Sequence, residues 1–88
     1  MKYEFTWTPA ARRALRSIPR EDAVRLLVAL TLLGDDPYRR DGVDVKALTG
    51  RSGFRLRVDN YRIVYEVDDG KLIILVVSAG HRRDIYVR

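Results

Sequence analysis

A group of basic side chains in the second half of the chain could bind a phosphate and stabilise a charged phosphoryl transition state. They are Arg55, Arg57, Arg62, His81 and Arg82, and Tyr86 belongs to the same cluster. Guanidinium groups bind phosphate oxygens through two parallel hydrogen bonds and can neutralise the charge that develops as a phosphoryl group reacts. A tyrosine beside them can stack on an unpaired base. These residue types together indicate RNA binding or RNA cleavage.

Several of these side chains also have a simpler interpretation. Arg55 could form a diagonal ion pair with Glu66 on a neighbouring strand. Either Arg82 or Arg83 could pair with Asp84, and Arg83 is the favoured partner. His81 taken alone is typical of a surface residue at the end of a strand. No serine of the chain has a recognisable neighbouring base, and there is no glycine-rich phosphate loop.

A β-hairpin that would position three of the arginines is predicted over residues 53–67, with the sequence GFRLRVDNYRIVYEV. Asp59-Asn60 is the expected two-residue turn, because both residue types tolerate the left-handed conformation. In this register Arg57 lies directly across from Arg62, with Cβ atoms roughly 5 Å apart. Like charges at that distance repel each other, and an anion bound on this face would remove the repulsion. The hairpin therefore predicts a phosphate-binding site.

A second hairpin is expected to bring the end of the last long strand to the same place. Asp69-Gly70 is a strong tight-turn signal ahead of an apolar, β-branched run that is typical of a central strand. A two-residue turn there pairs Arg62 with Val77. His81 and Arg82 then emerge beside the arginines of the first hairpin.

Two helices are expected ahead of these hairpins. Alternating aromatic residues predict a half-buried strand over residues 2–7, and Thr8-Pro9 is typical of a helix N-cap followed by proline, with the first helix running to about Ser17. A second helix is expected over about residues 20–33, with a wide apolar arc and Leu32 near its polar strip. This order predicts an α+β fold in which two N-terminal helices pack on a mostly antiparallel four- to five-stranded sheet.

The 88 residues are expected to form one domain, because a chain of this length buries only about two-thirds of its unfolded surface. Residues 35–48 are rich in Asp, Gly and Pro and are expected to be a connection, whose end at residues 46–48 docks ahead of the hairpin. With no cysteine and a single histidine, neither a disulfide scaffold nor a metal or other cofactor is expected.

The formal net charge of +5 favours an anionic partner, such as nucleic acid or an acidic protein, over a merely basic soluble surface. Only three residues are lysine, so the charge is mostly guanidinium, although a GC-rich genome would have the same effect. Arg12, Arg13 and Arg16 on the first helix are expected to form a solvated face or a partner surface. The chain starts without a signal-peptide apolar region, and its longest apolar run is too short for a bilayer, so a cytoplasmic protein is expected.

Three stretches together resemble the RelE toxins of bacterial toxin–antitoxin systems. They are Phe54–Val58 (FRLRV), Tyr61–Asp69 (YRIVYEVDD) and Gly80–Tyr86 (GHRRDIY). The resemblance extends over nearly the whole chain, because the strand–helix–helix beginning also fits. The second stretch followed by the third is typical of the RelE/ParE superfamily as a whole.

The resemblance implies a reaction and a role for several residues. Members of the RelE branch cut mRNA in the ribosomal A site without a metal, by attack of the 2′-hydroxyl on the adjacent phosphate, which leaves a cyclic phosphate and a 5′-hydroxyl end. Arg62 and Arg82 match the catalytic arginines of the family, and Tyr86 matches its base-stacking tyrosine. Arg55 and Arg57 match two basic positions that are lysines in the best-known members.

The arginines at these two positions leave the proton acceptor open. Arginine, with a pKa above about 12, is a poor general base, whereas the pKa of lysine can be lowered. We therefore expect Arg57, Arg62 and Arg82 to hold and neutralise the phosphate. Tyr86 is expected to stack on the base, and His81, with an unperturbed pKa near 6.5, or Arg57 to handle a proton. Further contacts with the RNA backbone are expected from Lys46, Arg51, Arg55 and Arg83.

The first interpretation is a toxin of a type II toxin–antitoxin system that cuts mRNA on the ribosome. A small acidic antitoxin would neutralise it by wrapping the helices and covering the basic face, and the two proteins could bind their own operator through the antitoxin. The alternatives are a ParE-like inhibitor that binds DNA gyrase without nuclease activity, and a non-catalytic RNA-binding module. The basic cluster with Tyr86 favours the first interpretation.

Overall fold

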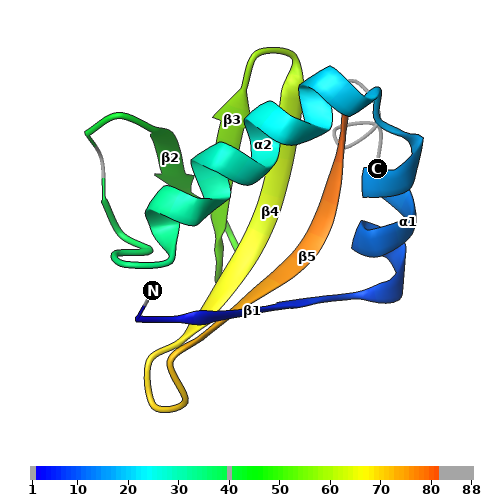
Figure 1. The fold of residues 1–88 in the computed structure, drawn as a ribbon. Coiled ribbons are helices and arrows are strands. Elements are labelled where there is room, and N and C mark those ends of the chain that lie inside the picture. The colour runs from blue at the N-terminus through cyan, green and yellow to red at the C-terminus, as the bar shows by residue number, and fades with distance from the viewer. Residues whose placement is uncertain (1, 40, 82–88) are drawn as a thin grey trace.

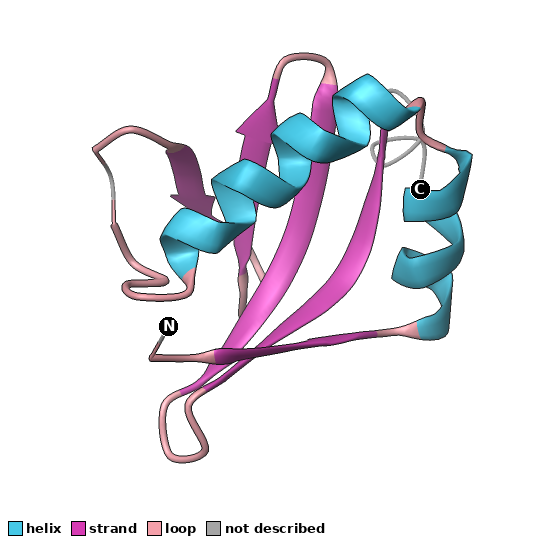
Figure 2. Cartoon of the chain, viewed as in Figure 1, coloured by secondary structure: helices cyan, strands magenta, loops and turns pink. Residues whose placement is uncertain are grey.

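Two helices lie on one face of a five-stranded sheet in a computed structural model of the chain (Figure 1, Figure 2). The structure describes residues 2–39 and 41–81. Its elements are, in chain order, β1 (Glu4–Trp7), α1 (Pro9–Ser17), α2 (Arg20–Leu33), β2 (Asp44–Ala47), β3 (Phe54–Val58), β4 (Tyr61–Asp68) and β5 (Ile73–His81). The strands lie in the order β1-β5-β4-β3-β2, with β1 parallel to β5 and all other neighbours antiparallel. The predicted α+β fold is confirmed.

The start of α1 is fixed by the threonine that precedes it. The side-chain oxygen of Thr8 accepts a hydrogen bond from the backbone N–H of Ala11 at 3.1 Å, which satisfies one of the free donors of the first turn. The same hydroxyl donates to the carbonyl oxygen of Val77 at 2.6 Å. Thr8 therefore caps the helix and also ties it to β5, and the predicted helix is confirmed at both ends.

One apolar cluster joins both helices to the sheet. α2 contributes Leu26, Leu30 and Leu33, and α1 contributes Ala11 and Ile18. The sheet residues of the cluster that are wholly inaccessible to solvent are Leu56, Ile63, Tyr65, Ile74 and Val76. Figure 1 shows α2 crossing β3 and β4, with α1 beside β5. Because strand side chains alternate, residues between these positions project from the face turned away from the helices.

The register of the first hairpin follows the predicted alternation. The apolar partners are Val58 with Tyr61, Leu56 with Ile63, and Phe54 with Tyr65. Asp59 adopts the left-handed conformation in the turn, with φ of 55°. Arg57 consequently lies opposite Arg62, as predicted.

The second hairpin differs from the two-residue turn predicted for it. Asp68 pairs with Ile73, so the loop between β4 and β5 holds four residues. Its last residue, Leu72, takes a φ of 55°, and the carboxylate of Asp68 accepts a hydrogen bond from the backbone N–H of Lys71 at 3.1 Å. A β-bulge between Val64 and Tyr65 shifts the register further.

The longer loop and the bulge change which residues lie beside the arginines. Arg62 is opposite Gly80, and the predicted pairing of Arg62 with Val77 is wrong. His81 lies opposite Tyr61.

A strand lies inside the predicted connection between α2 and the first hairpin. β2 pairs with β3 and makes one edge of the sheet. Of its four residues only Val45 is buried, so its alternation covers too few positions to be recognised in the sequence. In the described part of the chain, no helix has both the length and the apolar character needed to cross a membrane.

Candidate functional site

The strand register gathers four of the predicted site residues on the face of the sheet that is turned away from the helices. One row across β2, β3, β4 and β5 consists of Asp44, Arg57, Arg62 and Gly80. The next row consists of Lys46, Arg55, Val64 and Ser78. The two rows are two residues apart along each strand, or about 7 Å. We call Lys46, Arg55, Arg57 and Arg62 the basic face.

The members of the basic face differ in how far they are exposed. Arg62 is only 7% exposed, whereas Arg57 and Lys46 are exposed to solvent. Among the described residues, neither Arg57 nor Lys46 forms an ion pair. A charged group that is held away from solvent acts through a lower effective dielectric constant. The basic face therefore combines the shielded guanidinium of Arg62 with the accessible cations of Arg57 and Lys46.

Arg55 forms an ion pair, but with Asp44 and not with Glu66, the partner considered in its simpler interpretation. Its guanidinium donates to the carboxylate of Asp44 at 3.3 Å, and its side chain is 11% exposed. The difference arises because β2 places Asp44 diagonally across from Arg55. Asp44 also lies in the same row as Arg57 and Arg62, so a carboxylate that sequence reasoning missed belongs to this site. Prediction of β2 as a strand would have placed Asp44 beside Arg57 and identified it.

His81 is not brought beside the arginines of the basic face. Its ring meets the ring of Tyr61 edge-on, with centroids 5.9 Å apart. The hydroxyl of Tyr61 donates to the carboxylate of Asp22 on α2 at 2.9 Å, so both rings lie on the helix side of the sheet. This hydrogen bond raises the pKa of Tyr61 above its usual value. His81 directly follows Gly80, which is opposite Arg62, but its ring lies on the helix side, whereas Arg57 belongs to the other face.

The remaining predicted site residues are distributed as follows. Arg51 is exposed in the loop that precedes β3, at the end of that strand remote from Arg57. Arg82, Arg83 and Tyr86 lie outside the described residues. Within residues 2–39 and 41–81, no group of three or more His, Cys, Asp or Glu side chains could hold a metal ion.

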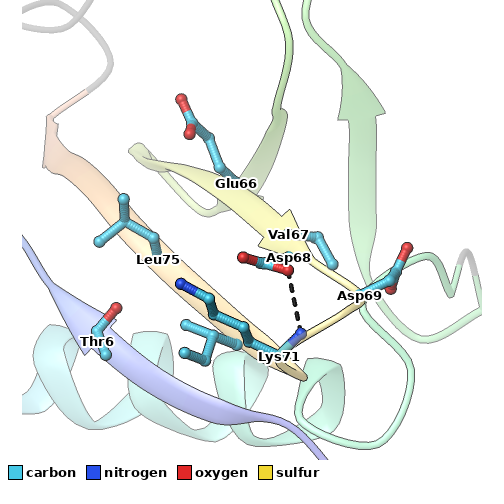
Figure 3. Close-up of a pocket in the computed structure, with 8 residues that line it drawn as sticks. Thr6, Glu66, Val67, Asp68, Asp69, Lys71 and Leu75 are labelled. Atoms are coloured by element: carbon cyan, nitrogen blue, oxygen red, sulfur yellow. Dashed lines mark hydrogen bonds between the residues drawn. The ribbon is translucent and has the colours of Figure 1, made fainter.

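A cavity of about 470 Å³ opens on the same face of the sheet, beside the loop between β4 and β5 (Figure 3). Glu66, Asp68 and Asp69 line it, together with a single cation, Lys71. Three carboxylates disfavour a phosphate ligand. The cavity is also remote from the basic face, because Asp68 is six positions along β4 from Arg62, or roughly 20 Å. It is therefore a separate feature of the surface.

Two tyrosines meet one carboxylate at this end of the sheet. The hydroxyls of Tyr3 and Tyr38 each donate to the carboxylate of Asp69 at 2.6 Å. These bonds lower the pKa of Asp69, and the bond to the carboxylate raises the pKa of Tyr38 to about 12. They fasten the loop after β4 to the start of the chain and to the connection after α2.

Comparison with known proteins shows the family to which this arrangement belongs. A family model described as the ParE toxin of the type II toxin–antitoxin system parDE matches residues 5–86. Toxin RelG of Mycobacterium tuberculosis is 33% identical over 89 residues, which is 100% of both chains. The archaeal RelE–RelB complex from Pyrococcus horikoshii OT3 contains a chain with a TM-score of 0.82 and 27% identity, covering 93% of this chain and 97% of that one.

The toxin–antitoxin complex RelBE2 from Mycobacterium tuberculosis gives a similar result. Its matching chain has a TM-score of 0.78 and 26% identity, and the match covers 93% of this chain and 100% of that one. The sheet order, the two helices and the basic face are thus found in a chain whose sequence relatives are toxins along its whole length. This protein belongs to the RelE/ParE superfamily of toxins from type II toxin–antitoxin systems.

Proposed function

We propose that this toxin is a ribosome-dependent mRNA endonuclease that needs no metal. The observation that carries the proposal is the basic face, in which Arg57 and Arg62 lie opposite each other beside Arg55 and Lys46. A phosphodiester placed over this pair would be neutralised by guanidinium groups from two strands. Its relatives named RelG and RelE support the same branch of the superfamily.

In the proposed reaction the 2′-oxygen of the RNA attacks the adjacent phosphorus. The bond between the 2′-oxygen and phosphorus forms, the bond from phosphorus to the 5′-oxygen breaks, and the products are a 2′,3′-cyclic phosphate and a 5′-hydroxyl end. Arg57 and Arg62 stabilise the charge on the phosphoryl oxygens. Arg82 and Tyr86, which lie outside the described residues, are proposed to hold the phosphate and stack on the base, as the resemblance implies.

Asp44 is proposed as the group that takes the proton of the 2′-hydroxyl. Asp44 lies directly across from Arg57, with their backbones one strand spacing or about 5 Å apart, so a carboxylate lies in the same row as the proposed phosphate site. A carboxylate accepts a proton far more readily than a guanidinium does. His81 has its ring against Tyr61 on the helix side, so we do not assign it this role. The 5′-oxygen would take its proton from water.

Cleavage of ribosome-bound mRNA by an Arg62→Ala variant tests the proposal. Primer extension on transcripts from cells that produce the variant should show no cut codons, whereas the parent chain produces them. Arg20→Ala is the matched control, because Arg20 is an exposed arginine on α2. Undiminished cleavage by the Arg62→Ala chain would sink the assignment.

The proposed partner that controls this activity is a cognate antitoxin. Solved structures similar to this chain include RelE–RelB and RelBE2 complexes. α2 exposes an apolar stripe of Val24, Leu27, Val28 and Leu32, which an apolar segment of the antitoxin could cover. An acidic remainder would then neutralise the basic face, and the complex could bind its own operator through the antitoxin.

The antitoxin surface can be tested with the most exposed member of this stripe. Val28 is 60% exposed, so Val28→Asp should leave the fold intact and weaken co-purification with the protein of the adjacent reading frame. Wild-type affinity of this variant would contradict the assignment of the surface.

A ParE-like action on DNA gyrase is the second candidate, and the match to the ParE toxin model favours it. Such a toxin acts by binding and needs no nuclease site. Production of the chain in cells should separate the two: rapid arrest of translation with cut transcripts supports the nuclease, and induction of the DNA-damage response supports the gyrase inhibitor.

A further inference from the structure

A second basic site lies where β1 meets α1, away from the basic face. A cavity of about 320 Å³ is lined there by Trp7, Pro9, Arg12, Arg13 and Arg16. Trp7 is the last residue of β1 and Pro9 the first of α1, so the capped turn at Thr8 holds the indole close to the helix. We call these five residues the α1 cavity.

The arginines of the α1 cavity carry unbalanced charge. Among the described residues, none of Arg12, Arg13 and Arg16 forms an ion pair, and all three are exposed. α1 contains no acidic residue, and its first turn has none. Arg12 and Arg16 are four residues apart, so like charges face each other on the helix surface, an arrangement that weakens a helix slightly. A bound anion would reverse that effect.

Trp7 gives the α1 cavity a flat apolar wall. The indole is half-buried, because one part packs against the core and another part lines the cavity. Charged side chains alone would explain a helix face that is merely exposed to solvent. An aromatic wall next to guanidinium groups also suits a ligand that has both a planar ring and an anionic group. Nucleotides in a single strand have this composition, since bases stack on aromatic side chains while phosphates bind arginine. The cavity volume also lies in the range of small-ligand sites.

The α1 cavity cannot be part of the phosphate site at Arg57 and Arg62. β4, which carries Arg62, and β3, which carries Arg57, lie about 10 Å and about 14 Å from β1 across the strands. In addition, α1 contributes to the core on the helix side, whereas the basic face projects from the other side. An RNA strand bound at the α1 cavity therefore leaves the basic face accessible.

We propose that the α1 cavity is an RNA-binding subsite, in which Trp7 stacks on an unpaired base while Arg12, Arg13 and Arg16 bind the neighbouring phosphates. This subsite would give the toxin a second contact with RNA. Its role on the ribosome rests on the proposed nuclease function. The ability of the subsite to bind RNA is independent of that function, because binding at Trp7 requires no cleavage. The competing occupant is an acidic peptide, which would use the guanidinium groups and leave the indole without a role.

Intrinsic fluorescence gives a direct test, because Trp7 is the only tryptophan of the chain. A short single-stranded poly(A) oligonucleotide, titrated into the purified protein, should quench this fluorescence saturably. The affinity should fall as the salt concentration is raised. In a plot of the logarithm of the binding constant against the logarithm of the salt concentration, the slope should become less steep by about 0.7 for each arginine of the cavity that is replaced by glutamine. The triple variant Arg12→Gln, Arg13→Gln, Arg16→Gln should bind at least about tenfold more weakly.

A matched variant separates this site from the rest of the surface. Arg20→Gln removes an exposed arginine outside the cavity and should leave the quenching curve unchanged. Far-UV circular dichroism should match the parent for every variant, and no variant should lower the urea midpoint, because the replaced side chains are exposed.

The outcomes are distinguishable. Quenching that the triple variant retains in full, or that oligoglutamate produces and poly(A) does not, overturns the proposed subsite and leaves the nuclease proposal intact. Normal quenching in a chain that fails to cut ribosome-bound mRNA supports the subsite and overturns the nuclease proposal instead.

Discussion

Replacing Asp44 by asparagine removes a negative charge from the row of Arg57 and Arg62 and keeps the size of the side chain. The Asp44 side chain is 50% exposed, and its ionic partner Arg55 is 11% exposed. Surface ion pairs contribute about 0–1 kcal/mol, and asparagine still offers an oxygen to the guanidinium. Asp44→Asn should therefore lower the free energy of unfolding by less than about 1 kcal/mol, as measured by urea denaturation.

The effect on cleavage should be far larger if Asp44 takes the proton of the 2′-hydroxyl. Loss of a general base slows a reaction by about 10²- to 10⁴-fold. The single-turnover rate on mRNA-programmed ribosomes should fall by that factor. Asp44→Glu keeps a carboxylate and should recover part of the rate.

Two results would refute this reasoning about Asp44. An Asp44→Asn chain that cleaves within about threefold of the parent rate excludes it as the base, since general-base loss costs far more. The second result is that Asp44→Glu loses as much rate as Asp44→Asn and that the urea midpoint is also lowered. Asp44 would then have a purely structural role through Arg55.

Three further predictions concern stability. Gly53 has a φ of 112°, and an added Cβ would lie 2.9 Å from the carbonyl oxygen of Tyr65, so Gly53→Ala should destabilise the chain by at least about 1–3 kcal/mol in urea titration. Thr8→Ala should cost about 0.5–2 kcal/mol, because α1 loses its cap; no change in the urea midpoint would mean that the hydroxyl contributes nothing. The stability advantage of the parent over Asp69→Asn should shrink as the pH falls below about 3.8, because the lowered pKa of Asp69 stabilises the fold only while the group is ionised. It should shrink again between pH 10 and about 12, where Tyr38 ionises, and a pH-independent difference would contradict both effects.

The first hairpin is predictable from the sequence because each of its strands alternates over at least five residues around a short turn. Any slip of one residue would move Leu56 and Ile63 out of the core, so the apolar pattern alone fixes the register. The opposition of Arg57 and Arg62 follows directly. Helix α1 is equally predictable, because the Thr8-Pro9 start is a local signal with a local cause.

The second hairpin is less predictable because its register depends on contacts that sequence patterns do not contain. Asp69-Gly70 indicates a two-residue turn, but the left-handed Leu72 and the hydrogen bond from Lys71 to Asp68 lengthen the loop. The bulge adds another shift, which turns His81 toward Tyr61.

The short strand β2 and the exposed face of α2 escape prediction for opposite reasons. β2 has a single buried residue, Val45, and one apolar position is too few to predict a strand. Asp44 is therefore also not predicted as a residue of the site. The rest of the chain buries only part of the apolar surface of α2, so Val24 and Val28 are apolar and yet exposed. Only Leu32 among the exposed apolar residues of this helix is foreseeable, because it lies near the polar strip.

The parallel pairing of β1 with β5 has a consequence for how this toxin is made. Residues 4–7 find their strand partner only in residues 73–76, near the other end of the chain. A nascent chain that lacks β5 has neither the strand that joins β1 to β4 nor the core side chains Ile74 and Val76. Contacts of such high sequence separation form late and slowly. The sheet therefore cannot close before residues 73–76 have been synthesised, and a chain released before that point is a substrate for proteases rather than a toxin.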